Sequence, residues 1–266
     1  MKERLDLLLV KRGLCESRSR ARAVIMEGAV FVNNEREDKP GSLFDRGADI
    51  QVKSNPIPFV SRGGLKLQKA IREFNIDLRD KIVMDIGAST GGFTDCMLQC
   101  GAGHVYSIDV GYGQLAYKLR TDSRVTVMER TNIRKVSPGD IQEKPEFASV
   151  DVSFISLRLV LPAAEKLLTA DHSIVALIKP QFEAGKEEVG KSGVVREANI
   201  HRRVIKEIRD FAVELGYSVG GITYSPIRGP KGNIEYLIYL CHDGTRGCDV
   251  KDEYIRGLVE ISHNGT

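Results

Sequence analysis

The sequence predicts an α/β protein whose main domain is a seven-stranded, mostly parallel, doubly wound sheet, preceded by a small α+β domain. From about residue 61, apolar segments of strand length alternate with amphipathic helical segments, the pattern of helices that cross between parallel strands. A glycine-rich turn follows the first of these strands, where such sheets bind ligands. Two prolines within three residues, Pro56 and Pro58, separate this region from a shorter one.

The small domain, residues 1–54, is predicted to contain two helices followed by short strands. Each helix has an apolar face, formed by Leu5, Leu8 and Leu9 in the first and by Ala21, Val24 and Ile25 in the second. Gly13 ends the first helix, and the second is expected to begin after an N-cap at Ser17 and to end at Gly28. Strands are expected at 30–32 and 50–52.

Basic residues are concentrated at the start of the chain. The net charge is only +3, yet residues 1–22 hold seven basic groups against three acidic ones. A local basic surface is what a protein needs to hold RNA phosphates. The candidates for RNA binding are Arg4, Lys11, Arg12, Arg18, Arg20 and Arg22. A solvated helix face is the alternative explanation of these charges.

Residues 55–60 are expected to form a stiff linker, because proline restricts the backbone. The large domain spans 61–242, and the tail at 243–266 carries no usable motif. Strands are predicted at 82–86, 104–109, 125–129, 147–152, 173–178, 217–224 and 234–241, and helices at 63–74, 91–100, 156–168 and 197–214. The last two strands flank a Gly/Pro turn at 228–232, so they should pair as an antiparallel edge of the sheet.

The turn after the first strand of the large domain is a candidate cofactor site. Its glycines stand at 87, 91 and 92, which matches neither a dinucleotide-binding loop nor a Walker loop. Asp85 would repel a pyrophosphate but suits a cationic sulfonium, and Asp109 stands where an acid accepts hydrogen bonds from ribose hydroxyls. These features indicate S-adenosylmethionine, although a purely structural turn is the alternative. The candidate cofactor residues are Asp85, Gly87, Ala88, Ser89, Gly91, Gly92, Phe93, Asp109 and Asn132, of which Asn132 either contacts adenine or caps a turn.

Four polar residues are expected to meet beside this turn. Asp151 and Lys179 follow the fourth and fifth strands, and the carboxyl ends of parallel strands share one crevice. Glu235 stands in an otherwise apolar strand and needs a partner, which Lys179 could supply if the fifth and seventh strands are adjacent. On the helix at 63–74, Lys66 borders the apolar stripe and can face the crevice, whereas Lys69 points away and should be in water.

The four residues suit the methylation of a sugar hydroxyl. A ribose 2′-hydroxyl needs a base, and positive charge favours the oxyanion that develops on it. Lys179 can be that base if its surroundings and Lys66 lower its pKa, with Asp151 and Glu235 orienting the two lysines. A structural network of ion pairs is the alternative.

The same residues carry a resemblance to a known family. In order and context, Lys66, Asp151, Lys179 and Glu235 resemble the Lys-Asp-Lys-Glu tetrad of FtsJ-like ribose 2′-O-methyltransferases, and residues 85–93 resemble that family's cofactor loop. The first domain resembles the S4 type of RNA-binding domain. The combination is similar to the TlyA family, also called hemolysin A. This implies a Rossmann-like fold, S-adenosylmethionine as cofactor, and 2′-O-methylation of ribosomal RNA, of cytidine in either subunit.

Other functions are less well supported. No apolar run approaches the roughly 18 residues of a membrane span, and no signal-peptide pattern is present, so a cytoplasmic protein is expected and a membrane-active hemolysin is disfavoured. The five cysteines include no Cys-x-x-Cys pair, which predicts reduced thiols and no metal site. A non-catalytic ribosome assembly factor and a small-molecule methyltransferase are the remaining alternatives.

The polar loop at 183–196 is expected to close over RNA or to be a plain surface loop.

Overall fold

The computed structural model describes residues 2–26, 28–33, 35–52, 57–242 and 250–264. Its contacts divide the chain into two compact units, residues 1–58 and 59–266. Two of the six residues of the predicted linker, Asn55 and Pro56, lie outside the described residues, as do Asn34 and Cys248. Within the described residues, no helix is both long and apolar enough to span a bilayer.

The first unit is a small α+β domain, as predicted. Its elements are β1 (Lys2–Arg4), α1 (Leu5–Lys11), α2 (Arg18–Met26), β2 (Val30–Val32), β3 (Glu35–Arg36), β4 (Leu43–Asp45) and β5 (Ile50–Val52). The Ser17 hydroxyl accepts a hydrogen bond from the Arg20 amide at 3.2 Å, which confirms the N-cap of α2. Gly13 and Gly28 follow α1 and α2 with φ of 70°. β1, β3 and β4, each two or three residues long, were not predicted.

The second unit has the predicted doubly wound sheet. Its strands are β6 (Ile82–Ile86), β7 (His104–Ile108), β8 (Val125–Met128), β9 (Phe147–Val150), β10 (Ser173–Ile178), β11 (Ser218–Tyr224) and β12 (Tyr236–Cys241). They lie in the order β11-β12-β10-β9-β6-β7-β8, and only the pairings of β12 are antiparallel. From β6 the chain adds β7 and β8 on one side and then returns to add β9 on the other side. This change in strand order between β6 and β9 creates a crevice at their carboxyl ends.

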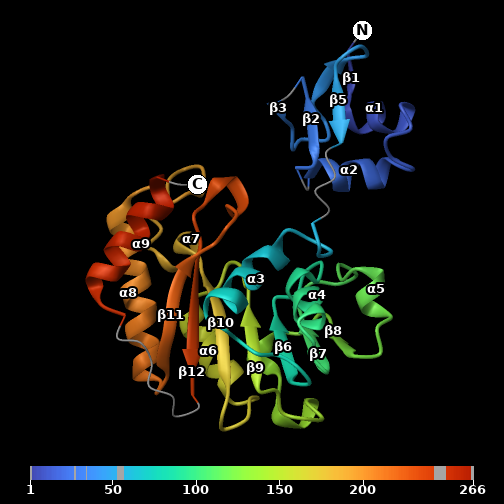
Figure 1. The fold of residues 1–266 in the computed structure, drawn as a ribbon. Helices are drawn as coiled ribbons and strands as arrows, with labels where there is room; N and C mark the ends of the chain where they lie inside the picture. Colours follow the sequence, from blue (N-terminus) through green and yellow to red (C-terminus); the bar gives the residue numbers. More distant parts are fainter. Residues whose placement is uncertain (1, 27, 34, 53–56, 243–249, 265–266) are drawn as a thin grey trace. The chain divides into compact units, whose positions relative to one another are not determined.

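Helices pack on both faces of this sheet (Figure 1). They are α3 (Gly63–Glu73), α4 (Gly92–Gln99), α5 (Tyr117–Arg120), α6 (Leu157–Glu165), α7 (Pro180–Glu183), α8 (Ala198–Glu214) and α9 (Asp252–Asn264), with short 3₁₀ turns at Ile133–Lys135, Pro138–Asp140 and Pro230–Gly232. The apolar sides of α6, α8 and α9 share one core with the strands; Val160, Ile205 and Val259 are fully buried there. This core fixes the strand ends that carry the site.

The strand order places two distant segments side by side. β12 lies between β10 and β11 and pairs with β10 so that Ile178 faces Tyr236. The predicted adjacency of the fifth and seventh strands is thereby confirmed. The predicted antiparallel pairing of the last two strands at an edge of the sheet is confirmed as well, with β11 outermost. Because Lys179 and Glu235 each flank one of these paired residues, they reach the same end of the sheet.

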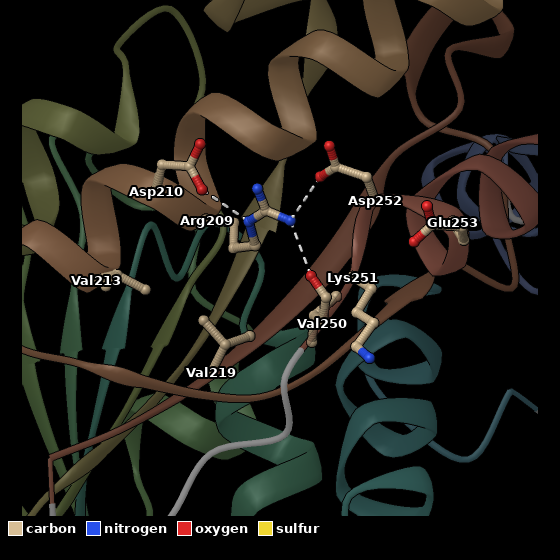
Figure 2. Close-up of a pocket in the computed structure, with 8 residues that line it drawn as sticks. All are labelled: Arg209, Asp210, Val213, Val219, Val250, Lys251, Asp252 and Glu253. Atoms are coloured by element: carbon tan, nitrogen blue, oxygen red, sulfur yellow. Dashed lines mark hydrogen bonds and ion pairs between the residues drawn. The ribbon is translucent and has the colours of Figure 1, made fainter.

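The tail predicted at 243–266 contains α9, which packs against α8 and β11. Figure 2 shows Arg209 of α8 reaching the start of α9: it donates to the Val250 carbonyl at 2.8 Å and to the Asp252 carboxylate at 3.0 Å. The hollow around Arg209 has a volume of about 550 Å³, and it is formed at this junction of two helices rather than at the strand ends.

Candidate active site

A pocket of about 490 Å³ lies over the carboxyl ends of β6, β7 and β9. Gly87 lines it with φ of 88°, a conformation that favours glycine. A Cβ atom at Gly87 would lie 2.4 Å from the Asp151 carbonyl oxygen, so only glycine lets the two strand ends approach this closely. The volume falls within the range of small-ligand sites, roughly 300–1,000 Å³.

The predicted cofactor residues divide between the wall of this pocket and its support. Gly87, Ser89, Asp109 and Asn132 line the pocket. Asp85, Ala88, Gly91, Gly92 and Phe93 are buried beneath it or in the first turn of α4. Gly91 has φ of 94°, and a Cβ atom there would lie 2.3 Å from the Leu119 side chain, so this glycine lets α4 start close to α5.

Asp85 lies under the loop and is fully buried. The Thr94 hydroxyl donates to its carboxylate at 2.6 Å and the Ser149 hydroxyl donates at 3.2 Å. Burial raises the pKa of Asp85 to about 7, although these hydrogen bonds oppose the rise. Asp85 therefore links the loop to β9 and α4, and it does not line the pocket, where a direct contact with a sulfonium was expected.

Asp109 follows β7 directly, Asn132 lies in the turn after β8, and both line the pocket. Both carboxylate oxygens of Asp109 accept backbone hydrogen bonds, from Ser89 at 2.7 Å and from Gly111 at 2.6 Å. A carboxylate has further lone pairs, so Asp109 can still accept a ligand hydroxyl. Asn132 accepts from the Arg134 amide at 3.1 Å and so caps the turn, and it also lines the pocket, where a contact with adenine was predicted.

The four predicted catalytic residues meet in one cluster, defined here as the tetrad: Lys66, Asp151, Lys179 and Glu235. Lys66 Nζ lies 2.7 Å from Glu235 Oε2 and 3.6 Å from Asp151 Oδ2. Lys179 Nζ lies 2.5 Å from Asp151 Oδ1 and 3.2 Å from Ser153 Oγ. Asp151 and Ser153 also line the cofactor pocket, so the tetrad adjoins it directly.

The charges in the tetrad stabilise one another. Burial acts to lower the pKa of Lys66, but the Asp151 and Glu235 carboxylates outweigh it, and the pKa of Lys66 is raised. Burial likewise acts to raise the pKa of Asp151, but the two ammonium groups outweigh it and hold that pKa below its usual value. Lys66 therefore stays protonated at this site.

Two details of the prediction were wrong. The partner of Glu235 is Lys66, because α3 crosses the strand ends and brings Lys66 onto this carboxylate. Lys69 is not in water, since only 12% of its side chain is exposed. Its ammonium donates to the Tyr224 carbonyl at 2.7 Å and lies 3.5 Å from the centre of that ring, because the end of β11 covers this side of α3.

Three further residues complete the site and were not predicted. Gln181 Nε2 donates to Glu235 Oε1 at 3.3 Å, while Gln181 Oε1 is buried without a partner among the described residues. Phe154 has φ of 63°, and it is 90% exposed at the rim of the cofactor pocket. Ser153 bonds Lys179 as described above. The sequence did offer one signal. Ser153 and Phe154 directly follow the predicted strand at 147–152, and a bulky apolar residue at that position lies beyond the core.

The six predicted RNA-binding residues have different surroundings in the first unit. Arg4 and Arg18 both bond the buried Asp6 at 3.0 Å and lower its pKa to about 2. Lys11 pairs with Glu3, and Arg12 donates to the Ala48 carbonyl at 2.8 Å. Arg20 and Arg22 are exposed on α2 and have no ion-pair partner in the described part of the chain.

The loop at 183–196 is anchored at its carboxyl end. The buried Asn233 donates to the Gly193 carbonyl at 3.0 Å and accepts from the Val195 amide at 3.3 Å.

Among the described residues no group of His, Cys, Asp or Glu is placed to hold a metal ion, and Cys15, Cys96, Cys100 and Cys241 are free thiols.

Comparisons with known proteins match both units. The family described as FtsJ-like methyltransferase matches residues 59–241, and the S4 domain matches residues 3–50. The chain is 53% identical over 265 residues to YqxC of Bacillus subtilis, a candidate rRNA methyltransferase, covering 98% of this chain and 94% of that protein. It is 42% identical over 261 residues to the 16S/23S rRNA (cytidine-2′-O)-methyltransferase TlyA of Mycobacterium tuberculosis, covering 98% and 96%.

A solved structure is also similar over nearly its whole length. A candidate hemolysin from Streptococcus thermophilus aligns with a TM-score of 0.78 and 50% identity, covering 98% of this chain and 96% of that one. This solved structure therefore shares the fold described above over nearly the whole chain.

Proposed function

Because the chain belongs to the FtsJ-like methyltransferase family, in the TlyA group that carries an N-terminal S4 domain, we propose that it methylates the 2′-hydroxyl of a cytidine in ribosomal RNA, with S-adenosylmethionine as cofactor. The observation that carries this proposal is the tetrad beside the pocket, with Lys179 Nζ 2.5 Å from Asp151 and Lys66 Nζ 2.7 Å from Glu235. Buried charges are costly unless they are paired, and a paired cluster of ionisable groups that borders a pocket is typical of a functional site.

Each member of the tetrad has a role in this chemistry. Lys179, once it has released its own proton, takes the proton of the 2′-hydroxyl, and Lys66, whose pKa is raised by two carboxylates, stabilises the oxyanion that develops. Asp151 orients both lysines, and Glu235 holds Lys66 in place. S-adenosylmethionine, when bound, supplies an electrophilic methyl group carried by a sulfonium.

The pocket and its rim fit the two substrates. Asp109, Ser89 and Asn132 surround the space for the nucleoside part of the cofactor, and Gly87 allows close approach to the backbone. At the rim, the exposed ring of Phe154 offers a face on which the base of the target nucleotide can stack, held by the Phe182 ring 4.9 Å behind it. The exposed cations Arg20 and Arg22 of the S4 domain are proposed to contact RNA phosphates.

The test is transfer of labelled methyl groups from S-adenosylmethionine to isolated ribosomal subunits and to free rRNA. Wild type should label RNA, and Lys179→Ala should lose at least about a hundredfold in rate, the usual effect of an acid–base residue. Lys179→Arg should be equally inactive, because a guanidinium stays protonated. Lys144→Ala, an exposed lysine before β9, is the control and should match wild type.

The product identifies the methylated atom. A 2′-O-methyl group blocks the attack of that oxygen on the neighbouring phosphate, so the labelled linkage should resist alkaline hydrolysis. Label that alkali releases as an ordinary nucleotide, or label in a nucleoside other than cytidine, would contradict the corresponding part of the proposal.

The relative from Streptococcus thermophilus that is named as a hemolysin raises a second candidate function, membrane lysis. Leakage of a dye from lipid vesicles distinguishes the two: the purified protein should cause no leakage beyond that caused by a heat-unfolded sample. Leakage together with the absence of methyl transfer would favour lysis.

A further inference from the structure

A second pocket lies beside the tetrad, with a volume of about 400 Å³ and no lining residue in common with the cofactor pocket. It is formed by the end of the 183–196 loop, by the turn before β12 and by the end of α9. Its polar side chains are Arg196, Arg228, Lys231 and His263. None of the lining residues that the structure describes is acidic, so the pocket is suited to an anion.

The three cations of the pocket lie at the protein surface. Arg196, Arg228 and Lys231 are all exposed, and Arg228 donates to the Gly232 carbonyl at 3.2 Å, which orients its guanidinium within the turn. Lys231 reaches toward the opposite wall: a Cβ atom at Gly193 would lie 3.2 Å from Lys231 Nζ. Planar guanidinium groups and a mobile ammonium are the groups that proteins use to bind phosphate.

His263 adds a buried polar atom to the pocket. Its Nε2 is buried and has no hydrogen-bond partner among the described residues. The ring packs against His201, with ring centres 4.8 Å apart and planes at 73°. Burial and the nearby Arg228 and Arg202 lower the pKa of His263, so its imidazole is neutral near pH 7. A neutral imidazole can still donate one N–H to a phosphate oxygen.

The pocket is rigid because one buried side chain joins its two walls. Asn233 donates to Gly193 and accepts from Val195, so the loop and the turn before β12 are held together. The Gly229 amide donates to the Asn233 carbonyl at 2.9 Å and closes the turn. A preformed site of this kind loses little freedom when it binds a ligand.

The same turn contacts the tetrad. A Cβ atom at Gly229 would lie 2.1 Å from Glu235 Oε1, so the backbone between Arg228 and Lys231 packs directly on the tetrad carboxylate. An anion bound in this pocket would therefore lie close to a ligand bound at Lys66 and Lys179.

We propose that Arg196, Arg228, Lys231 and His263 bind a backbone phosphate of the RNA next to the nucleotide that is methylated. This inference rests on the proposed function, because it takes the ligand to be RNA. The phosphate would fix the position of the strand along the crevice, and the chemistry would remain with the tetrad.

The experiment compares Arg228→Gln/Lys231→Gln with wild type, using the full chain and isolated rRNA. KM for RNA should rise about tenfold while kcat stays within twofold, and the plot of log affinity against log salt should become shallower by roughly one. The control is Lys144→Gln/Lys166→Gln, which removes the same charge from exposed positions at the opposite end of the strands and should behave as wild type. His263→Phe should raise KM about threefold.

Three outcomes decide the matter. If wild type transfers methyl groups but the Arg228/Lys231 variant keeps the KM and salt slope of the control, the phosphate site is wrong and the proposed function stands. If kcat falls instead of KM rising, these residues act in the chemistry, which also overturns the inference. If wild type methylates no rRNA, filter binding to the same RNA still tests the pocket, and loss of affinity in the variant would retain it.

Discussion

Lys66 and Glu235 lie 169 positions apart in the chain, yet Lys66 Nζ is 2.7 Å from Glu235 Oε2 and both residues are buried. Helix α3 supplies the lysine and the residue before β12 supplies the carboxylate, so the pair ties the first element of the second unit to the last strand of its sheet.

Removing one partner of this pair should destabilise the protein more than removing both. Glu235→Leu leaves Lys66 with Asp151 alone, at 3.6 Å, and Lys66→Met leaves a buried carboxylate. The double variant has neither unpaired charge, so a double-mutant cycle of urea unfolding should give a coupling of about 1–3 kcal/mol. Additive losses would show that the pair contributes nothing to stability. All three variants should lose methyl transfer.

Lys69 is expected to affect stability and to leave catalysis nearly unchanged. Its ammonium bonds the Tyr224 carbonyl and lies over the Tyr224 ring. Lys69→Ala should lower the free energy of unfolding by roughly 1 kcal/mol, as the loss of one hydrogen bond does, and keep the transfer rate within threefold. A hundredfold loss of rate with unchanged stability would place Lys69 in the active site.

Asp85 should make the stability of the second unit depend on pH. The pKa of Asp85 is about 7 in the folded chain and near 3.8 when unfolded, so the folded state holds a proton that the unfolded state releases. Its contribution to stability is complete below about pH 4 and is lost as the pH rises through 7. Between pH 5 and 8, wild type should lose roughly 2–4 kcal/mol relative to Asp85→Asn. Parallel pH profiles of the two proteins in urea unfolding would contradict this.

The basic residues of the S4 domain should fall into two classes. Arg4→Gln leaves the buried Asp6 with one partner fewer, so it should destabilise the first unit by about 1–3 kcal/mol. Arg20→Gln/Arg22→Gln should leave stability within about 0.5 kcal/mol and weaken RNA binding, with a shallower salt dependence. RNA affinity should be compared under conditions in which both variants are fully folded. If Arg4→Gln then weakens RNA binding as much as Arg20→Gln/Arg22→Gln does, the division into two classes is wrong.

The sheet and the tetrad were predictable because strong local signals mark both. Strand–helix alternation with a glycine turn fixes the order of elements, and the polar residues Asp151 and Lys179 stand directly after apolar strands. Very short elements escaped prediction: two- and three-residue strands such as β3 and β4 have no measurable periodicity, and α5 has only four residues.

Contacts made by the tertiary fold were harder to predict. Helical periodicity correctly placed Lys66 at the border of the apolar face of α3, but it could not show that Tyr224 covers Lys69. The choice of partner for Glu235 depends on how α3 crosses the strand ends, which no spacing in the chain records. Phe154 is exposed because of a left-handed backbone turn, and a pattern of residue types cannot reveal such a turn.

The late position of β12 in the chain has a consequence for synthesis. Glu235 and the strand that supports it leave the ribosome after the pocket, Lys66, Asp151 and Lys179 have already emerged. A chain whose synthesis has not yet reached Glu235 therefore lacks the last member of the tetrad. The proposed activity has to wait until β12 has been made, although the proposed substrate is part of the machine that makes it.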